Sequence, residues 1–332
     1  MTHHRHSLWR WGLPVLALAG VFWLSLFCWS PVPISAFDAL HALMPAGSPS
    51  LPEALVQNLR LPRSLVAILT GASLALAGTL LQTLTHNPLA SPSLLGINSG
   101  AALAMAVVSA ISPTPLAGFS LAFIAAAGGG LCWLLVMTAG GGWRRSLDRH
   151  RVILAGIALS ALCMALTRVT LLLAEDHAYG IFYWLAGGVS HARWQEFWHL
   201  FPVVVLVTPV ILLMSKHLNL LNISDDTAHT LGVNLQRVRL VINLAVLLLV
   251  GACVSVAGPV AFIGLLMPHL ARLWTGHAHQ RLLPMSMLLG ATFMLLADVV
   301  SRGLAWPGEL PAGVVVALIG APGFVWLARR RG

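Results

Sequence analysis

Two arginines stand close together in QNLRLPRSLVA (57–67), where a polar stretch passes into a long apolar run. They are Arg60 and Arg63, and Pro62 lies between them. A guanidinium is costly in or near a bilayer, so its charge has to face protein, water or a membrane surface. Two uses fit this position: anchoring a helix end at the membrane interface, or presenting positive charge to a partner.

A third arginine, Arg168, lies inside another apolar run, about two turns from its end. An arginine at the centre of a membrane helix costs about 2.5–3.5 kcal/mol on insertion scales. We therefore expect Arg168 to face protein or a water-filled path. Pairing with Glu175 or Asp298, snorkelling, and contact with a substrate all remain compatible with the sequence.

Sequence motifs for catalysis are missing from the chain. It has no GxxxxGK[ST] nucleotide-binding loop, no HExxH and no Ser/His/Asp grouping, and its sole lysine is Lys216. The four cysteines are isolated in apolar stretches, which is typical of packing residues rather than of metal ligands. We predict no enzymatic activity, no cofactor and no metal site, so the energy for any transport must come from a partner or an ion gradient.

The composition identifies the class of protein that positions these residues. Of 332 residues, 58% are hydrophobic and only 9% are charged, against about 25% in soluble domains. Mean hydropathy is +0.85. The chain is therefore predicted to be an all-α polytopic membrane protein. The net charge of +9 does not indicate a nucleic-acid partner, because the arginines lie in loops between apolar segments.

About 20 apolar residues cross a bilayer as a helix, and ten segments of the chain approach that length. They are 13–34, 61–84, 93–112, 115–138, 152–174, 199–217, 240–257, 259–275, 283–304 and 311–328.

The distribution of charge predicts an orientation. If both termini are cytoplasmic, most of the nineteen basic residues face the cytoplasm, as the positive-inside rule requires. Those left for the other side are Arg60, Arg63, Arg168, Arg193 and Arg302. Arg60 and Arg63 thus lie on the side that should be poor in arginine.

A short internal sequence repeat suggests two related halves. GASLALAG (71–78) and GACVSVAG (251–258) share glycine and alanine at the same places. Ten spans divide into two sets of five, roughly 13–174 and 199–328, and an odd number makes the repeats inverted in the membrane. Close helix packing through small residues is an alternative explanation of the same pattern.

Two inward segments interrupt the apolar pattern. HNPLASPSLLGINSG (86–100) is broken by prolines, so it must be buried in protein, line a cavity or form a plain turn. The longest inward loop, 216–239, is predicted to form a short helical pair with an apolar side. Such a side indicates either a docking surface or a helix packed on its own bundle.

Several of these segments occur together in order, with AGPVAFIGLLMPHLAR, LLADVVSR, GELPAGVV and IGAPGFVWL. In this combination the chain resembles the permease subunits of iron-siderophore and vitamin B12 ABC importers (FecCD type) over roughly residues 13–330. Within that family, THNPLASPSLLGINSGAALAMA (85–106) and VTLLLAED (169–176) are similar to ferric dicitrate importers.

The resemblance implies a type II ABC importer permease: one transmembrane domain over 1–332, in the bacterial inner membrane, with ten helices and both termini cytoplasmic. It implies three kinds of protein partner besides membrane lipid: a homologous second permease in a heterodimer, two cytoplasmic ATPase subunits, and a periplasmic substrate-binding protein. The expected substrate is an iron(III) chelate, foremost ferric dicitrate. Another siderophore or a cobalamin-like ligand is the alternative, and an ion-coupled secondary transporter or a membrane scaffold without transport fits less well.

The resemblance also assigns roles to particular residues. Arg60, Arg63 and Arg302 match positions that meet acidic residues of the binding protein. The loop 227–234 matches the segment that couples to the ATPase, which singles out Ala228, Leu231, Gly232 and Val233. For an anionic chelate, Arg168 is the candidate residue on the substrate pathway.

Overall fold

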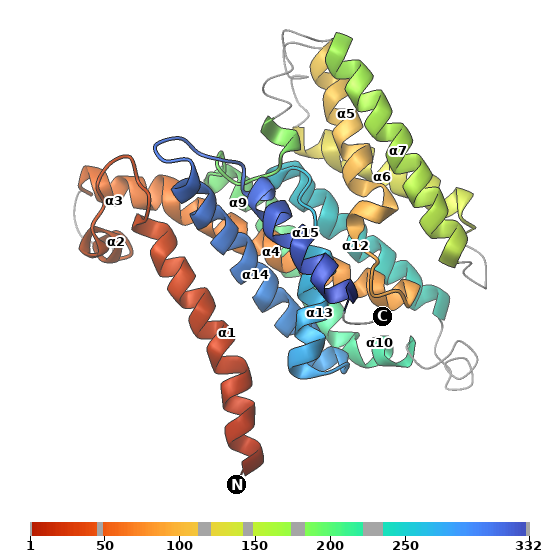
Figure 1. Cartoon of the computed structure of the whole chain (residues 1–332), viewed down its shortest axis with the longest axis horizontal. Helices are drawn as coiled ribbons and strands as arrows, with labels where there is room; N and C mark the ends of the chain where they lie inside the picture. The colour runs from red at the N-terminus through yellow and green to blue at the C-terminus, as the bar shows by residue number, and fades with distance from the viewer. Residues whose placement is uncertain are drawn as a thin grey trace.

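In the computed structural model the elements are helices joined by turns and loops (Figure 1). The structure describes residues 2–44, 49–111, 121–141, 149–173, 183–221 and 235–329. The long helices of this part of the chain are α1 (Thr2–Phe27), α4 (Leu61–Thr85), α5 (Ile97–Ile111), α6 (Leu121–Ala139), α7 (Arg149–Leu173), α9 (Trp194–Leu213), α12 (Leu235–Ala257), α13 (Ile263–Thr275), α14 (His279–Leu304) and α15 (Ala312–Arg329). Short elements are α2 (Ala36–Ala42), α3 (Leu51–Leu55), a π-helical turn Val56–Arg60, a 3₁₀ turn Pro92–Leu95 and α10 (Ser215–Leu221).

Each of the ten predicted spans overlaps one of these long helices. Six helical stretches among the described residues are long and apolar enough to cross a membrane, and three shorter apolar helices accompany them. The thirteen-residue α13 belongs to neither group, and it is too short for the first. The all-helical, membrane-spanning fold is therefore confirmed, whereas the number of ten spans stays a prediction.

The centre of the fold is α4, and 83% of its apolar 18-residue segment is buried inside the chain. It packs closely against α14 because both helices carry glycine at the contact: a Cβ on Gly71 would lie only 2.2 Å from the carbonyl oxygen of Gly290. Further along, the Thr79 hydroxyl donates to Ser286 Oγ at 3.0 Å. Small residues thus let the two backbones approach, and a hydroxyl pair joins them toward the end of α4 and the start of α14.

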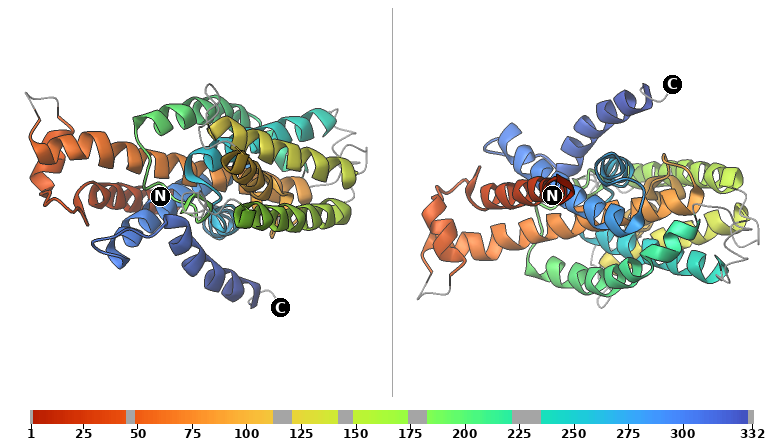
Figure 2. Two further views of the ribbon diagram at one scale, coloured as in Figure 1. Left: turned by 90° about the horizontal axis from the view of Figure 1, so that it is seen from above. Right: turned by 90° about the horizontal axis from the view of Figure 1, so that it is seen from below.

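The second copy of the glycine-alanine repeat, residues 251–258, packs on a different helix from the first. Gly251 of α12 lies against Ala126 of α6, and Gly258 follows α12 with φ +67°, a conformation that favours glycine. Helices α5, α6 and α7 form a group on the side of the bundle away from α1 (Figure 1). The first turns of α15 are buried against the bundle at Ala312, Val315 and Val316, while its C-terminal end projects from it (Figure 2).

The segment after α4 explains how that helix stops. His86 adopts a left-handed conformation with φ 48°, and α5 begins at Ile97 after the 3₁₀ turn. Ala90, Ser91 and Leu95 of this segment are buried. The proline-broken stretch is therefore covered by protein, one of the situations expected for irregular backbone beside membrane helices.

Candidate functional site

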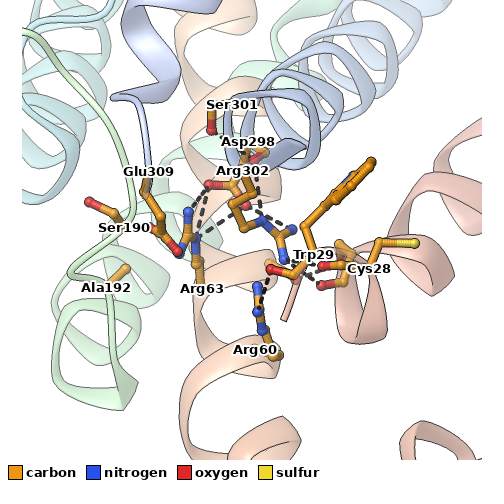
Figure 3. Close-up of polar contacts among 12 residues, drawn as sticks. Cys28, Trp29, Arg60, Arg63, Ser190, Ala192, Asp298, Ser301, Arg302 and Glu309 are labelled. Atoms are coloured by element: carbon orange, nitrogen blue, oxygen red, sulfur yellow. Dashed lines mark hydrogen bonds and ion pairs between the residues drawn. The ribbon is translucent and has the colours of Figure 1, made fainter. Parts of the chain in front are cut away.

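The side chains singled out by the sequence meet at one end of the α4–α14 pair. We call Arg60, Arg63, Asp298, Arg302 and Glu309 the arginine cluster (Figure 3). Its members come from the start of α4, the last turns of α14 and the connection between α14 and α15.

Arg63 is bound to two carboxylates. Its Nε donates to Asp298 Oδ1 at 2.9 Å, and its Nη1 donates to Glu309 Oε2 at 2.9 Å. Its Nη2 also lies 2.9 Å from Asp298 Oδ1, an ion pair without hydrogen-bond geometry. Asp298 is fully buried, while 34% of the Glu309 side chain is exposed. Arg63 therefore joins α4 to α14 and to the connection that leads into α15.

Arg302 shares Asp298 with Arg63 and also caps the C-terminal end of α1. Its Nη2 lies 3.1 Å from Asp298 Oδ2, and its Nη1 donates to the carbonyl oxygens of Ser25 and Cys28 at 3.1 and 3.3 Å. Carbonyls at the end of a helix have no partner within the helix, and a cation there also suits the helix dipole. Arg302 is 1% exposed, so it works inside the protein.

Arg60 is the arginine with the fewest hydrogen bonds in the cluster. Its Nη2 donates to the carbonyl oxygen of Trp29 at 3.1 Å, just past the end of α1. Its Nη1 is buried without a hydrogen-bond partner among the described residues. The helix-anchoring use of this arginine is therefore visible in the structure.

Local sequence places the cluster. The π-helical turn Val56–Arg60 inserts directly before α4, and Pro62 stands in the first turn of α4, where a missing N–H breaks no helical hydrogen bond. Asp298 and Arg302 are four residues apart on α14, so their side chains lie on the same face. The extra residue in the π-turn sets the direction in which Arg60 leaves the helix.

The charges of the cluster do not balance. Three guanidinium groups face two carboxylates, Asp298 and Glu309, and the three arginines are at most 7% exposed. A buried charge is retained only when it is paired or hydrogen-bonded. Such a site offers no nucleophile or acid–base pair; it can fix helix ends and attract one more anionic group.

The opposite end of the α4–α14 pair is joined by neutral groups. The His279 ring of α14 lies between Thr83 of α4 and Asn219 of α10, with Nε2 2.8 Å from Thr83 Oγ1 and Nδ1 2.7 Å from Asn219 Oδ1. Asn219 Oδ1 also accepts from the His279 backbone N–H at 2.9 Å. We call these three residues the histidine junction.

A second histidine bond reaches the end of α10. His86, just after α4, lies with Nε2 2.7 Å from the carbonyl oxygen of Leu221, the last residue of that helix. The histidine junction was not foreseen from the sequence, because one histidine and one asparagine near helix ends give no distinctive pattern. The segment that follows α10 carries the predicted coupling residues.

Those coupling residues, Ala228, Leu231, Gly232 and Val233, lie outside the described residues. Within the predicted 216–239 segment the structure describes most of α10 and the first turn of α12, which starts at Leu235 rather than near 240.

Arg168 does not join the arginine cluster. It lies on α7 with an exposed side chain, among apolar residues that are also exposed, such as Leu166 and Val169. Asp298, one acidic partner considered for it, is held by Arg63 and Arg302 instead. Arg168 therefore points out of this single chain.

The structure also brings together two cysteines that looked isolated in the sequence. Cys132 of α6 and Cys163 of α7 are buried with their sulfur atoms 3.8 Å apart. They are free thiols at a helix–helix contact, consistent with the packing role expected of them.

Comparisons with known proteins give the chain its relatives. The sequence model of the FecCD transport family matches residues 16–330. Over 332 residues, all of both proteins, the chain is 74% identical to the Fe(3+) dicitrate transport system permease protein FecC of Escherichia coli (strain K12). It is 37% identical over 298 residues to the Fe(3+)-citrate import system permease protein YfmD of Bacillus subtilis (strain 168), covering 90% of this chain and 87% of that one.

The relatives also include proteins named for another ligand or for a wider class of substrate. The vitamin B12 import system permease protein BtuC of Salmonella paratyphi A is 38% identical over 279 residues, or 83% of each chain. A solved metal-chelate-type ABC transporter in an inward-facing conformation matches with a TM-score of 0.82 at 32% identity, covering 96% of this chain and 97% of that one.

Proposed function

Because the chain belongs to the FecCD transport family, we propose that it carries an iron(III) chelate, ferric dicitrate, from the periplasm to the cytoplasm as the permease of an ATP-driven importer. The chain is a non-catalytic transport permease, and ATP hydrolysis in such importers is performed by separate ATPases. The single observation that carries the choice of substrate is the 74% identity, over the full length, to a permease named for Fe(3+) dicitrate transport.

Other substrates are the alternative, since relatives at 37–38% identity include permeases named for hemin and vitamin B12. An ion-coupled carrier fits less well. Asp298, the deep carboxylate that could have carried a proton, is engaged by two arginines as an ion-pair partner.

A complementation experiment tests the substrate. The chain is expressed in an E. coli strain whose own 74% identical permease is deleted, and uptake of radioactive iron is measured with citrate or with a hydroxamate siderophore as chelator. We expect uptake to return with citrate only. Uptake restored with the hydroxamate and not with citrate would overturn the choice of substrate.

The proposed assembly has one more permease, two cytoplasmic ATPases and a periplasmic binding protein. The second permease, a homologue in a heterodimer, would cover apolar faces that this chain leaves open. Only 17% of the apolar 18-residue segment of α7 is buried within the chain, and Leu172 and Leu173 at its end are among the most exposed hydrophobic residues. Helix α15, whose C-terminal end projects from the bundle, likewise exposes Leu318 and Trp326 (Figure 2).

Arg168 supports a path between the two permeases. Its exposed side chain on α7 would be unfavourable against lipid but suitable beside a ferric chelate that carries negative charge. We expect Arg168→Gln to lower uptake of an anionic iron chelate more than uptake of a neutral one, measured side by side in the same cells. Equal loss for both would indicate a structural role.

The two inverted halves, roughly 13–174 and 199–328, also stay a proposal. Two matching glycines of the sequence repeat support it. Gly71 of α4 packs on α14, the fourth long helix of the second half. Gly251 of α12 packs on α6, the fourth long helix of the first half. An inverted repeat would relate these two contacts. With both termini in the cytoplasm, the arginine cluster faces the periplasm and the histidine junction faces the cytoplasm.

Docking of the binding protein is proposed at the arginine cluster, through Arg60, Arg63 and Arg302. The unbalanced positive charge supports it, because an acidic residue of the partner would supply the missing carboxylate. The geometry divides the work. Arg60 has one buried nitrogen, Nη1, without a hydrogen-bond partner in the described part of the chain. Arg63 becomes available where the partly exposed Glu309 is displaced, and the buried Arg302 supports both.

Coupling to the ATPase is proposed for the 227–234 segment, with Ala228, Leu231, Gly232 and Val233 in contact. The support lies in α10, which precedes the segment and is bonded to α14 through Asn219 and to the end of α4 through His86. A displacement of the coupling segment would thus reach both central helices directly.

A further inference from the structure

A polar cavity lies beside the histidine junction, at the end of α4, α13 and α14. Its volume is about 400 Å³, and the residues that give it its chemistry are Gln82, Thr83, His86, Arg272, His277 and His279. Neither the docking surface nor the coupling segment uses this cavity.

Hydrogen bonds fix the groups that face the cavity. Gln82 donates from Nε2 to the carbonyl oxygens of Gly264 and Leu265 at 3.3 and 3.2 Å, which aims its side-chain oxygen at Arg272. Arg272 donates from Nη2 to that oxygen. The guanidinium is therefore held in place before any ligand arrives, which reduces the entropy lost on binding.

The cavity is positive and rich in donors. Its lining residues in the described part of the chain include one arginine and three histidines and no carboxylate. The N-terminus of the 26-residue α14, at His279, adds partial positive charge at the same place. His277 is exposed, so its ring can meet a ligand from outside, while His86 is exposed but keeps Nε2 on the carbonyl oxygen of Leu221. This arrangement is complementary to an anion.

The neighbouring surface suggests what carries the anion. Helix α13 ends at Thr275, and its last two turns expose apolar side chains: Leu270, Leu273 and Trp274 are 37%, 70% and 39% exposed. Tryptophan is enriched where helices leave the bilayer, and basic pockets between helices on the cytoplasmic side hold lipid head groups.

We propose that the cavity bounded by Arg272, His277 and His86 binds the phosphate-bearing head group of an anionic phospholipid. Arg272 supplies the fixed charge, and the exposed His277 supplies a donor to a remaining oxygen. The bound lipid would occupy the junction of α4, α13 and α14 and so hold these three helices together at this end.

The test compares ligands on the purified full-length chain. Native mass spectrometry in detergent measures binding of phosphatidylglycerol, of phosphatidylcholine, and of phosphatidylglycerol in the presence of inorganic phosphate. We expect phosphatidylglycerol to bind more tightly than phosphatidylcholine. Arg272→Gln should weaken phosphatidylglycerol binding by about tenfold, the value of one charge-assisted contact.

Two further variants keep the result interpretable. Arg281→Gln removes an exposed arginine two residues into α14, outside the cavity, and should leave binding within about twofold. His277→Gln tests the same cavity without removing the fixed guanidinium and should give an intermediate loss. Equal weakening by Arg272→Gln and Arg281→Gln, or equal binding of the two lipids, would overturn the proposal. Tight binding of inorganic phosphate with no preference for either lipid would also overturn it.

Discussion

The two ends of the α4–α14 pair are held by different chemistry. At one end, three arginines and two carboxylates are packed into the protein, and Asp298 is shared by Arg63 and Arg302. At the other, His279 links Thr83 and Asn219 through hydrogen bonds between neutral groups. Buried ion pairs are costly to break but can exchange partners, whereas neutral bonds are weaker and adapt to small displacements. The comparison suggests that the first end responds to a charged partner and the second to movement.

The largest effect is expected from removing the shared carboxylate. Asp298→Ala leaves two buried guanidinium groups without their common partner, and breaking a buried pair in this way costs about 3–5 kcal/mol. The fraction of folded, monodisperse chain that survives heating in detergent measures it. Glu309→Ala is the matched control, because the Glu309 carboxylate is partly exposed and pairs with Arg63 alone in the described chain. Equal loss in both variants would contradict the central place of Asp298.

A second prediction concerns the contact that joins the two ends. Gly71→Ala places a methyl group against the Gly290 carbonyl and 2.7 Å from Met294 Cβ, so α4 and α14 must separate. We expect a stability loss on the order of 1–3 kcal/mol, measured by the same heating assay. Gly20→Ala is the control, since nothing lies within 4 Å of a Cβ there, and alanine favours helix. If Gly71→Ala behaves like Gly20→Ala, the close packing is not needed.

A change in the histidine junction should lower stability less than the changes above, but it should weaken the coupling of ATP hydrolysis to the binding protein more clearly. Asn219→Ala removes the acceptor of both the ring and the backbone of His279, at a cost of about 1–2 kcal/mol. ATP hydrolysis by the reconstituted importer should then respond less to the loaded binding protein. Gln280→Ala, which removes only the other partner of Asn219, should leave the response unchanged. The reverse order of effects would show that the histidine junction is not the link.

The smallest effect is expected at the exposed edge of the arginine cluster. In the proposed docking, an acidic residue of the binding protein displaces the Glu309 carboxylate from Arg63. Glu309→Gln removes that competing carboxylate, so the affinity should rise about threefold at low salt. Binding-protein affinity for the reconstituted importer, measured at two salt concentrations, checks this. Weaker binding by the variant would indicate that Glu309 itself forms part of the docking surface.

Much of this fold could be predicted from apolar segment lengths. Each predicted span overlaps a helix, although the predicted boundaries differ from the observed ones. Helix α9 starts at Trp194 rather than 199, and α13 starts at Ile263 rather than 259. The π-helical turn before α4 could not be predicted, because its extra residue depends on the packing of Val56 and the bonding of Arg60 rather than on local pattern.

The site was predictable in part. Composition and orientation singled out Arg60 and Arg63, and the spacing of Asp298 and Arg302 could have indicated an ion pair on α14. The pairing of Arg63 with Asp298 spans 235 positions and follows from helix packing, which no local pattern encodes. For the same reason the sequence suggested external partners for these arginines, and the structure adds partners inside the chain.

The most direct test of the account is a double-mutant cycle between the two ends. Arg60→Gln and Asn219→Ala are made singly and together in the reconstituted importer, and the binding-protein concentration that half-stimulates ATP hydrolysis is measured. Changes at distant, independent sites add within about 0.3–0.5 kcal/mol. If the α4–α14 pair links docking to coupling, the double variant should depart from the sum of the single ones by more than that. Strict additivity would contradict the link.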